Sequence, residues 1–591
     1  MSPSAEDRRV GLWMAVDVDP VTLTVVENYL TSTCRDMGVT MMTTAYSPIF
    51  NESLDFSCVL FDPEGNMLAQ AEFCPSQIGT IKFTVAWTIA ELTQAGFDEG
   101  DIVVHNDPYR GSGHVPEHML LMPVFHEGEL VAFVANVAHM SEVGAKTPGG
   151  LCGDATEIYQ EGLLLPPVKL RRRGQDVTDI WHILMANHRT PRVTYGDLRA
   201  MIGSLELGRR RILELIGSIG RNAFVASASE LMSVAERRMR AEIAKIPDGT
   251  YEFADTIEDD GLCDRSYEIR LALTIDGDEV IADFTGSADQ AVGPVNAIYA
   301  VTASAVYNAF LHLTDASIPR NEGAYRPFTV IAPYGTIVNC AFPAPVAGGN
   351  TETSPRITDM IFGALAPAIP ERVAASCGGT SSPFLFGGRD SRTGEAYAHF
   401  HFEGVGWGGR NGADGNDMVV TINGNCRNTP VEIFETRYPC FRIQSYRLLE
   451  DSGGAGQYRG GLGGERVFEV TDNVTVSALL NRMLTSPWGV LGGREGAMGG
   501  LWVRRKGAES WQTFVEAFGT RSPSKFSGVE LHAGDAVRIR MPGGGGYGDP
   551  LKRDPEFVAR DVREGFVSEE AAREVYRWRG RPVADGRVAQ S

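Results

Sequence analysis

The stretch that decides how this chain arranges its chemistry is "HMLLMPVFHEGELVAFVANVAHM", residues 118–140. Two apolar runs flank the polar residues 126–129, a pattern that is typical of a β-hairpin. A three-residue loop at 127–129 would pair Glu117 with His139, whereas a two-residue loop would place position 116 there. In either register Glu117 and His139 are neighbours across the hairpin, and His114 lies close to both.

Histidines are concentrated around this hairpin. The chain has only 11 histidines in 591 residues, yet five of them fall between residues 105 and 139: His105, His114, His118, His126 and His139. Two imidazoles and one carboxylate form the ligand set of catalytic zinc, manganese and non-haem iron sites. His114, Glu117 and His139 are therefore candidate metal ligands, and Asp55, at the start of "DFSCVLF", is a candidate fourth. The alternative is that these residues cap the hairpin end and contact solvent, with Asp55 as a strand-end carboxylate.

The remaining patterns predict an α+β fold in a large, mixed, multi-domain subunit. Helical spacing follows Asp19-Pro20 and recurs at 198–218, 227–245 and 295–313, while 251–284 alternates in strand fashion. Glycine becomes dense after about residue 400, which favours an α/β-type N-terminal half and a β-rich, glycine-rich C-terminal half. We expect an N-terminal arm at 1–18, an α/β region with the candidate metal site at 19–250, a middle α+β region at 251–400, a β-rich region at 401–550 and a helical tail at 551–591.

Charge and cysteine content exclude several classes of protein. The formal net charge is −21, which argues against a nucleic-acid partner or an anionic membrane partner. The nine cysteines are scattered and contain no CxxC pair, so neither a zinc ribbon nor a disulfide framework is expected. The N-terminus lacks the apolar core of a signal peptide, and no apolar run is long enough for a membrane helix. A soluble protein of the reducing cytoplasm is the resulting expectation.

The glycine-rich motifs do not predict a nucleotide site. Residues 404–409 match GxGxxG, but they follow no clear strand and open no amphipathic helix. The segment "GGGGYGDP" (543–550) lacks the lysine and the helix of a phosphate loop. ATP chemistry is therefore expected on another chain. The segments 348–356 and 377–383 are either backbone linings of a pocket or tight turns at a subunit interface.

Several long segments resemble the hydantoinase B / 5-oxoprolinase B family, in matching order from about residue 19 to about residue 575. They include "YSPIFNESLDFSCVLFDPEGNMLAQAEF", "NDPYRGSGHVPEH", "DATEIYQEGLLLPPVKL" and "DSGGAGQYRGGLGG". The resemblance implies a hetero-oligomer with a hydantoinase A type subunit, which binds ATP and phosphorylates a carbonyl oxygen of a small-molecule lactam, imide or ketone. It also implies a divalent metal, zinc or manganese, on His114, Glu117 and His139, with Asp55 as a further ligand.

The resemblance leaves the reaction open. In the hydantoinases, oxoprolinases and lactamases of this family the B-type subunit hydrolyses the activated cyclic amide, and in the acetone and acetophenone carboxylases it carboxylates an enol phosphate. We expect the hydrolase, with the ketone carboxylase and a metal-free scaffold as alternatives. Asp107 and His118 are candidate proton carriers, although strand alternation turns His118 to the face opposite Glu117. Glu117 stands where the family carries Asp, and Met140 replaces a common second histidine.

Overall fold

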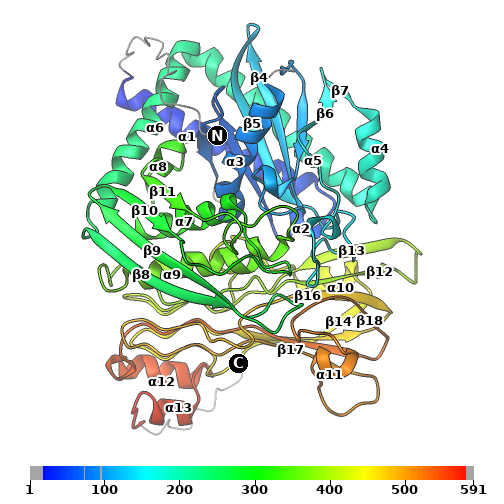
Figure 1. Cartoon of the computed structure of the whole chain (residues 1–591), viewed down its shortest axis with the longest axis vertical. Coiled ribbons are helices and arrows are strands. Elements are labelled where there is room, and N and C mark those ends of the chain that lie inside the picture. Colours follow the sequence, from blue (N-terminus) through cyan, green and yellow to red (C-terminus); the bar gives the residue numbers. More distant parts are fainter. Residues whose placement is uncertain (1–17, 72, 94–95, 581–591) are drawn as a thin grey trace, which may run out of the picture.

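A seven-stranded antiparallel sheet contains the predicted hairpin and lies in the upper part of the molecule (Figure 1). The computed structural model describes residues 18–71, 73–93 and 96–580, so the expected arm at 1–18 lies outside the described residues apart from its last position. The strand order is β2-β1-β5-β4-β3-β6-β7. The bounds are β1 (Phe56–Phe61), β2 (Met67–Gln70), β3 (Ile102–His105), β4 (Glu117–His126), β5 (Glu129–His139), β6 (Val168–Arg172) and β7 (Gln175–Asp176).

The hairpin β4–β5 has the shorter of the two loops that the sequence allows. His126 pairs with Glu129 across a two-residue turn, Glu127-Gly128, in which both residues have positive φ. This loop alone would pair position 116 with His139. A β-bulge next to Val124 inserts one extra residue into β5, and the pairing of Glu117 with His139 results.

Helices cover both faces of this sheet, because its strands are apolar on both sides. Cys58 and Leu60 of β1 pack into one apolar core with α1 (Pro20–Thr44) and α5 (Pro191–Ile219). Val59 and Phe61 pack into a second core with α3 (Pro75–Leu92), α7 (Tyr299–Leu313) and α9 (Ser354–Leu365). The second core also holds a four-stranded sheet of order β11-β10-β9-β8: β8 (Gly249–Ile257), β9 (Tyr267–Asp276), β10 (Glu279–Asp283) and β11 (Phe328–Ile331).

The remaining helices are short except for one. They are α2 (Pro48–Asn51), α4 (Thr178–Asn187), the long α6 (Arg221–Ile243), α8 (Glu322–Tyr325), α10 (Val431–Arg437), α11 (Phe514–Phe518), α12 (Pro555–Arg563) and α13 (Glu569–Glu574), with single turns η1 (Pro108–Arg110), η2 (Ile158–Gln160), η3 (Gly349–Thr353) and η4 (Pro550–Lys552).

The C-terminal half is β-rich, as the sequence predicts, and its strands form a β-sandwich. One sheet has the order β13-β12-β16-β18 and the other β14-β15-β19-β17, and aromatic and aliphatic side chains of both sheets form a shared core. The bounds are β12 (Phe384–Arg389), β13 (Ala396–His401), β14 (Phe441–Leu448), β15 (Gly464–Val470), β16 (Val474–Leu479), β17 (Gly500–Arg504), β18 (Lys525–Leu531) and β19 (Ala536–Arg540). The sandwich therefore begins before residue 400, where we expected the boundary, because its first two strands precede the glycine-rich segments.

Glycine-rich segments pack backbone against backbone beside the sandwich. A Cβ on Gly406 would lie 2.1 Å from the carbonyl oxygen of Gly461, and one on Gly544 would lie 2.0 Å from that of Trp407. Gly461 and Gly544 are joined by a backbone hydrogen bond of 2.9 Å. No side chain fits between these segments, so close packing explains the glycines of both the 404–409 motif and the 543–550 motif.

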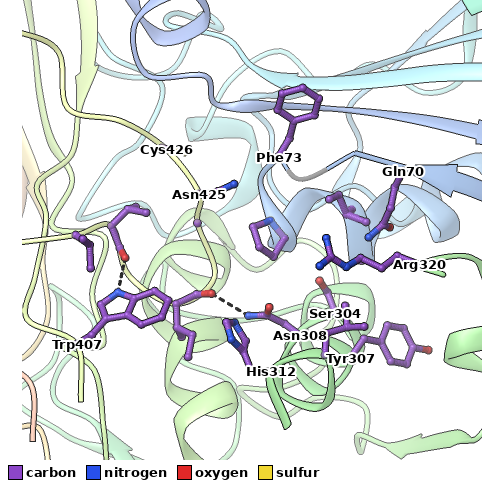
Figure 2. A pocket seen from close by; sticks show the side chains of 18 of the residues that line it. Gln70, Phe73, Ser304, Tyr307, Asn308, His312, Arg320, Trp407, Asn425 and Cys426 are labelled. Carbon is purple, nitrogen blue, oxygen red and sulfur yellow. Dashed lines mark hydrogen bonds between the residues drawn. The ribbon is translucent and has the colours of Figure 1, made fainter. Parts of the chain in front are cut away.

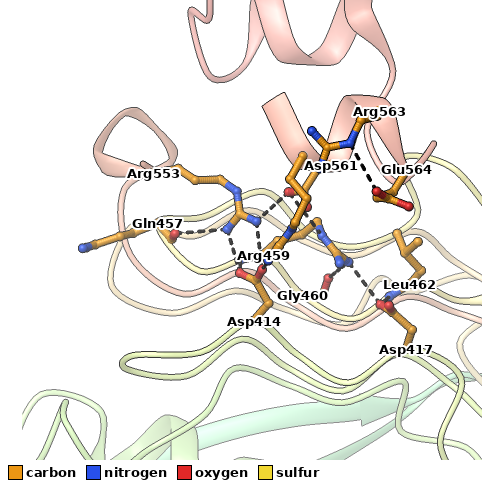
Figure 3. Close-up of polar contacts among 11 residues, drawn as sticks. Asp414, Asp417, Gln457, Arg459, Gly460, Leu462, Arg553, Asp561, Arg563 and Glu564 are labelled. Atoms are coloured by element: carbon orange, nitrogen blue, oxygen red, sulfur yellow. Dashed lines mark hydrogen bonds and ion pairs between the residues drawn. The ribbon is translucent and has the colours of Figure 1, made fainter. Parts of the chain in front are cut away.

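Buried ion pairs join the C-terminal helices to this glycine-rich layer (Figure 3). The fully buried Arg553 binds Asp414 at 2.6 Å and Asp561 of α12 at 2.5 Å. The N-caps of α12 and α13 are Asp554 and Ser568, residue types whose side-chain oxygens accept hydrogen bonds from the first turn of a helix. None of the nine cysteines forms a disulfide in the described part of the chain. Among the described residues, the helices are too short or too polar to cross a bilayer.

Candidate metal centre

Three neighbouring strands of the seven-stranded sheet, β1, β5 and β4, have one terminus on the same side of the sheet. Three of the candidate ligands lie at these termini. Glu117 begins β4 and pairs with His139, the last residue of β5. Asp55 precedes β1, and its carbonyl oxygen accepts the backbone N–H of His139 at 3.0 Å. Residues far apart in sequence therefore meet because β5 lies between β1 and β4.

His114 reaches the same place from the loop before β4. The backbone N–H of Glu117 donates to the His114 carbonyl at 3.0 Å, and this turn brings the two side chains together. The distance from His114 Nε2 to Glu117 Oε1 is 3.7 Å, and the rings of His114 and His139 are 4.9 Å apart. Gly113 leaves room for the carboxylate, since a Cβ there would lie 2.2 Å from Glu117 Oε2.

These side chains are buried and keep unpaired polar atoms. His114, Glu117 and His139 are each at most 2 % exposed. His114 Nε2, Glu117 Oε2 and both ring nitrogens of His139 have no hydrogen-bond partner. A buried polar atom without a partner costs about 1–3 kcal/mol, and three such residues around one cavity are unusual in a purely structural cluster. The donor set therefore fits a bound divalent cation.

Hydrogen bonds orient three of the four candidate ligands, His114, Glu117 and Asp55. His114 Nδ1 lies 3.2 Å from the Ala347 carbonyl oxygen, so this nitrogen carries the proton and Nε2 keeps its lone pair. Asn350 Nδ2 donates to Glu117 Oε1 at 2.9 Å. Gln77 Nε2 donates to Asp55 Oδ1 at 2.9 Å. Such outer contacts orient side chains for metal binding.

The electrostatics of the cluster favour a cation. Burial raises the pKa of Asp55 to about 7, and burial together with the nearby Asp55 carboxylate raises the pKa of Glu117 to about 8. Burial lowers the pKa of His114 to about 4 and that of His139 well below its usual value. Both imidazoles are therefore neutral near pH 7, which is the form that binds metals, and a cation would offset the repulsion between the carboxylates.

Two cysteines complete the cluster, and no sequence pattern pointed to either. Donor atoms of Asp55, Cys74 and Cys426 all lie within 4.8 Å of one another. In the described part of the chain, this is the group of three possible metal donors with that spacing. His114, Glu117 and His139 line the same cavity beside it. Cys74 precedes α3, whereas Cys426 comes from a loop of the C-terminal half, and no local pattern connects them.

The cavity around this cluster measures about 40 Å³ and draws its walls from distant segments. Asn350, Thr351 and Ser381 line it, so the segments 348–356 and 377–383 do reach a cavity, the first as a helical turn rather than a loop. The Phe400 ring stacks on His139 with centroids 4.2 Å apart. A larger cavity of about 670 Å³ adjoins it (Figure 2), and the two share Phe402, Val420, Gly424 and Cys426 as lining residues.

The two candidate proton carriers do not line either cavity. Asp107 caps η1 by accepting from the Tyr109 N–H at 2.9 Å, and it pairs with Arg110. His118 points to the other face of β4, as strand alternation predicts, and its ring lies 6.1 Å from that of His188. His105 is buried against Thr88 of α3. Asp107 and His118 thus lie outside the walls of both cavities, and their role as proton carriers stays a prediction.

The fold and this cavity together define a large α+β chain with two imidazoles, two carboxylates and two thiols gathered at one sheet edge. The family model described as Hydantoinase B/oxoprolinase matches residues 19–550, and the chain belongs to this family.

Two named Pseudomonas relatives align along nearly their whole length. The B subunit of a putative D-/L-hydantoinase from Pseudomonas sp. (strain NS671) is 32% identical over 575 residues, covering 94% of each chain. The beta subunit of the caprolactamase from Pseudomonas jessenii is 33% identical over 569 residues, covering 95% of this chain and 96% of that one.

Solved structures share the fold. The crystal structure of the ATP-dependent caprolactamase from Pseudomonas jessenii matches with a TM-score of 0.86 at 31% identity, over 95% of this chain and 96% of that one. A nucleotide-free acetone carboxylase matches with a TM-score of 0.85 at 23% identity, over 94% of this chain and 79% of that one, and this likeness shows the fold alone.

Proposed function

We propose that this chain is the metal-dependent subunit of an ATP-dependent complex that hydrolyses a cyclic amide of the hydantoin, oxoproline or lactam type. The observation that carries the proposal is the buried set of Asp55, His114, Glu117 and His139, with unpaired donor atoms beside a larger cavity. The relatives named as a hydantoinase subunit and a caprolactamase subunit support the substrate class.

The four residues would hold one divalent ion, zinc or manganese. When bound, such an ion supplies Lewis-acid activation of an oxygen at neutral pH. The chain's own residues prepare the site for it. The Ala347 carbonyl fixes the tautomer of His114, Asn350 turns the Glu117 carboxylate, and Phe400 covers one face of the His139 ring and keeps water from it.

ATP would be bound by a partner subunit of the hydantoinase A type. This chain has no phosphate-loop sequence, and its GxGxxG segment is packed against other backbone segments. Both Pseudomonas relatives are named as one subunit of a larger enzyme, which fits a hetero-oligomer. The nine cysteines form no disulfide in the described part of the chain, which fits a reducing compartment, and we place the complex in the cytoplasm.

The ketone carboxylase is the weaker alternative, because its structural relative is only 23% identical, whereas the relatives named as hydantoinase and caprolactamase subunits are 32% and 33% identical. The test is to purify the chain with its partner and to measure ATP hydrolysis and ring-opened product for a panel of hydantoins, oxoproline and lactams, with and without bicarbonate. We expect ring opening that requires both subunits, ATP and intact His114, and that ignores bicarbonate. ATP turnover that requires bicarbonate and a ketone would contradict the hydrolase.

A further inference from the structure

The larger cavity is a chamber that opens onto the candidate metal centre. Its walls come from α3, α7, the loop before α8 and the 402–428 segment. Figure 2 shows Gln70, Ser304 and Arg320 on one side and Trp407, Asn425 and Cys426 on the other. Cys426 also lines the smaller cavity, so the chamber extends from Arg320 to the metal side.

The chamber has one formal charge on its described walls. The chain as a whole carries −21, but the described residues that line the chamber include no Asp, Glu or Lys, and Arg320 is the one cation. His312 lies on the same wall, and desolvation together with the nearby Arg320 lowers the pKa of its imidazole below the ordinary value of 6.5. Its imidazole is therefore neutral near pH 7, which leaves the guanidinium as the one positive group.

The acidic neighbours of Arg320 are bound to other cations. Asp315 pairs with Arg238 at 3.0 Å, and Glu322 pairs with Lys82 at 2.8 Å. Within the described chain no carboxylate lies at ion-pair distance from Arg320, which is only partly buried and faces the chamber. A guanidinium at a cavity wall with no counter-ion among the described residues is suited to a planar oxyanion, since its fork of N–H donors matches a carboxylate or a phosphate.

The loop that carries Arg320 is held in place. Arg238 of α6 donates to the Ser317 carbonyl at 2.9 Å, and Asn321 donates to the Leu231 carbonyl at 3.2 Å. Ile318 is buried in the second core. The backbone at Arg320 is thus held by the fold, and little ordering of the loop is needed when an anion binds.

Aromatic side chains and uncharged polar groups form the rest of the walls. Phe73, Tyr307 and Trp407 present ring faces or edges to the chamber. Trp407 Nε1 donates to the Val420 carbonyl at 2.7 Å, and Asn308 donates to the Ile422 carbonyl at 3.0 Å, so both side chains are fixed. Such walls accommodate a flat ring better than a flexible charged chain.

We propose that this chamber binds a ring compound that carries an oxyanion, with Arg320 pairing the anion while the ring extends toward the metal side. The inference rests on the proposed function and adds a specificity-determining residue to it. The oxyanion has two sources, a carboxylate on the substrate itself or the phosphoryl group added by the partner subunit, and both present the same chemistry to Arg320.

Calorimetric titration of the purified full chain tests this with a matched pair of probes. 5-Oxoproline and 2-pyrrolidinone share a lactam ring and differ in the carboxylate, and inorganic phosphate represents the other source. We compare wild type with Arg320→Gln, Arg320→Lys and a control, Arg326→Gln, whose partly exposed arginine pairs with Glu236 outside the chamber. Metal content is measured in every sample.

We expect at least one anion to bind wild type, about tenfold or more weaker binding to Arg320→Gln, partial recovery in Arg320→Lys and no change in the control. Tighter binding of 5-oxoproline than of 2-pyrrolidinone identifies the substrate carboxylate, and Arg320-dependent binding of phosphate identifies the phosphoryl group. Absence of anion binding to wild type, or binding that is independent of Arg320, overturns the inference. Loss of metal affects the proposed function alone, because Arg320 is not among the metal ligands.

Discussion

Glu161 supports the candidate metal centre without touching it. Replacing Glu161 by Ala therefore tests a supporting contact while all candidate metal ligands stay in place. Its fully buried carboxylate accepts the backbone N–H of Val346 at 3.0 Å and that of Ala347 at 2.9 Å. The Ala347 carbonyl in turn contacts His114 Nδ1. The Glu161 side chain therefore holds the backbone that fixes the tautomer and direction of a candidate ligand.

The structure sets the size of the effect. Glu161→Ala leaves two buried N–H donors unsatisfied at about 1–3 kcal/mol each, so we expect a loss of about 2–6 kcal/mol in the free energy of unfolding. Disturbing an outer contact of a metal ligand costs about 10–100-fold in metal affinity, and we expect the lower end because the contact acts through Ala347.

Guanidinium unfolding and zinc competition titrations measure the two effects in parallel. Glu161→Gln keeps one acceptor oxygen and should fall between wild type and Glu161→Ala. Glu157→Ala is the matched control, since Glu157 is exposed four positions earlier and makes no capping hydrogen bond. Wild-type stability and wild-type metal affinity in Glu161→Ala would refute this reasoning.

Two further predictions follow from groups near the site. Gly113→Ala should abolish most metal binding while the protein stays folded, because the new Cβ displaces the Glu117 carboxylate. The control variant Gly217→Ala, with no atom near its new Cβ, should bind metal normally. Metal analysis after gel filtration compares the two variants. In the metal-free chain, burial raises the pKa of Glu161 and of Glu352 to about 8 from 4.5, so the folded state binds more protons than the unfolded state above about pH 7.5, where about nine-tenths of the unfolded histidines are neutral. The unfolding midpoint should therefore fall as the pH rises from about 7.5 to about 8.5, and a midpoint that rises over this window would contradict the assignment.

The sequence predicted what depends on local pairing. The alternation in 118–140 and the turn residues Glu127-Gly128 place Glu117 beside His139 in every reasonable register, and the apolar run after Asp55 explains why β1 joins the same sheet. The bulge in β5 could not be predicted, because it depends on how β5 packs between its two neighbours.

The rest of the site depends on contacts between distant segments. Cys426, Asn350 and Phe400 reach the cavity from the middle of the chain and its C-terminal half, and nothing in their local sequence marks them as neighbours of Glu117. For Asp107, in contrast, the local sequence predicted a role in the site, but the residue lies outside the walls of both cavities. Its position beside the histidine-rich segment suggested a proton carrier, but its carboxylate is used to cap a turn and to pair with Arg110.

The metal content of the purified chain tests the central claim most directly. Plasma mass spectrometry should find about one equivalent of zinc or manganese in wild type, near none in His114→Ala and in His139→Ala, and a retained ion in Cys74→Ser, whose thiol lies beside the proposed ligands. A chain without metal even after reconstitution, or an ion that survives both histidine variants and is lost with Cys74, would contradict the His–carboxylate centre.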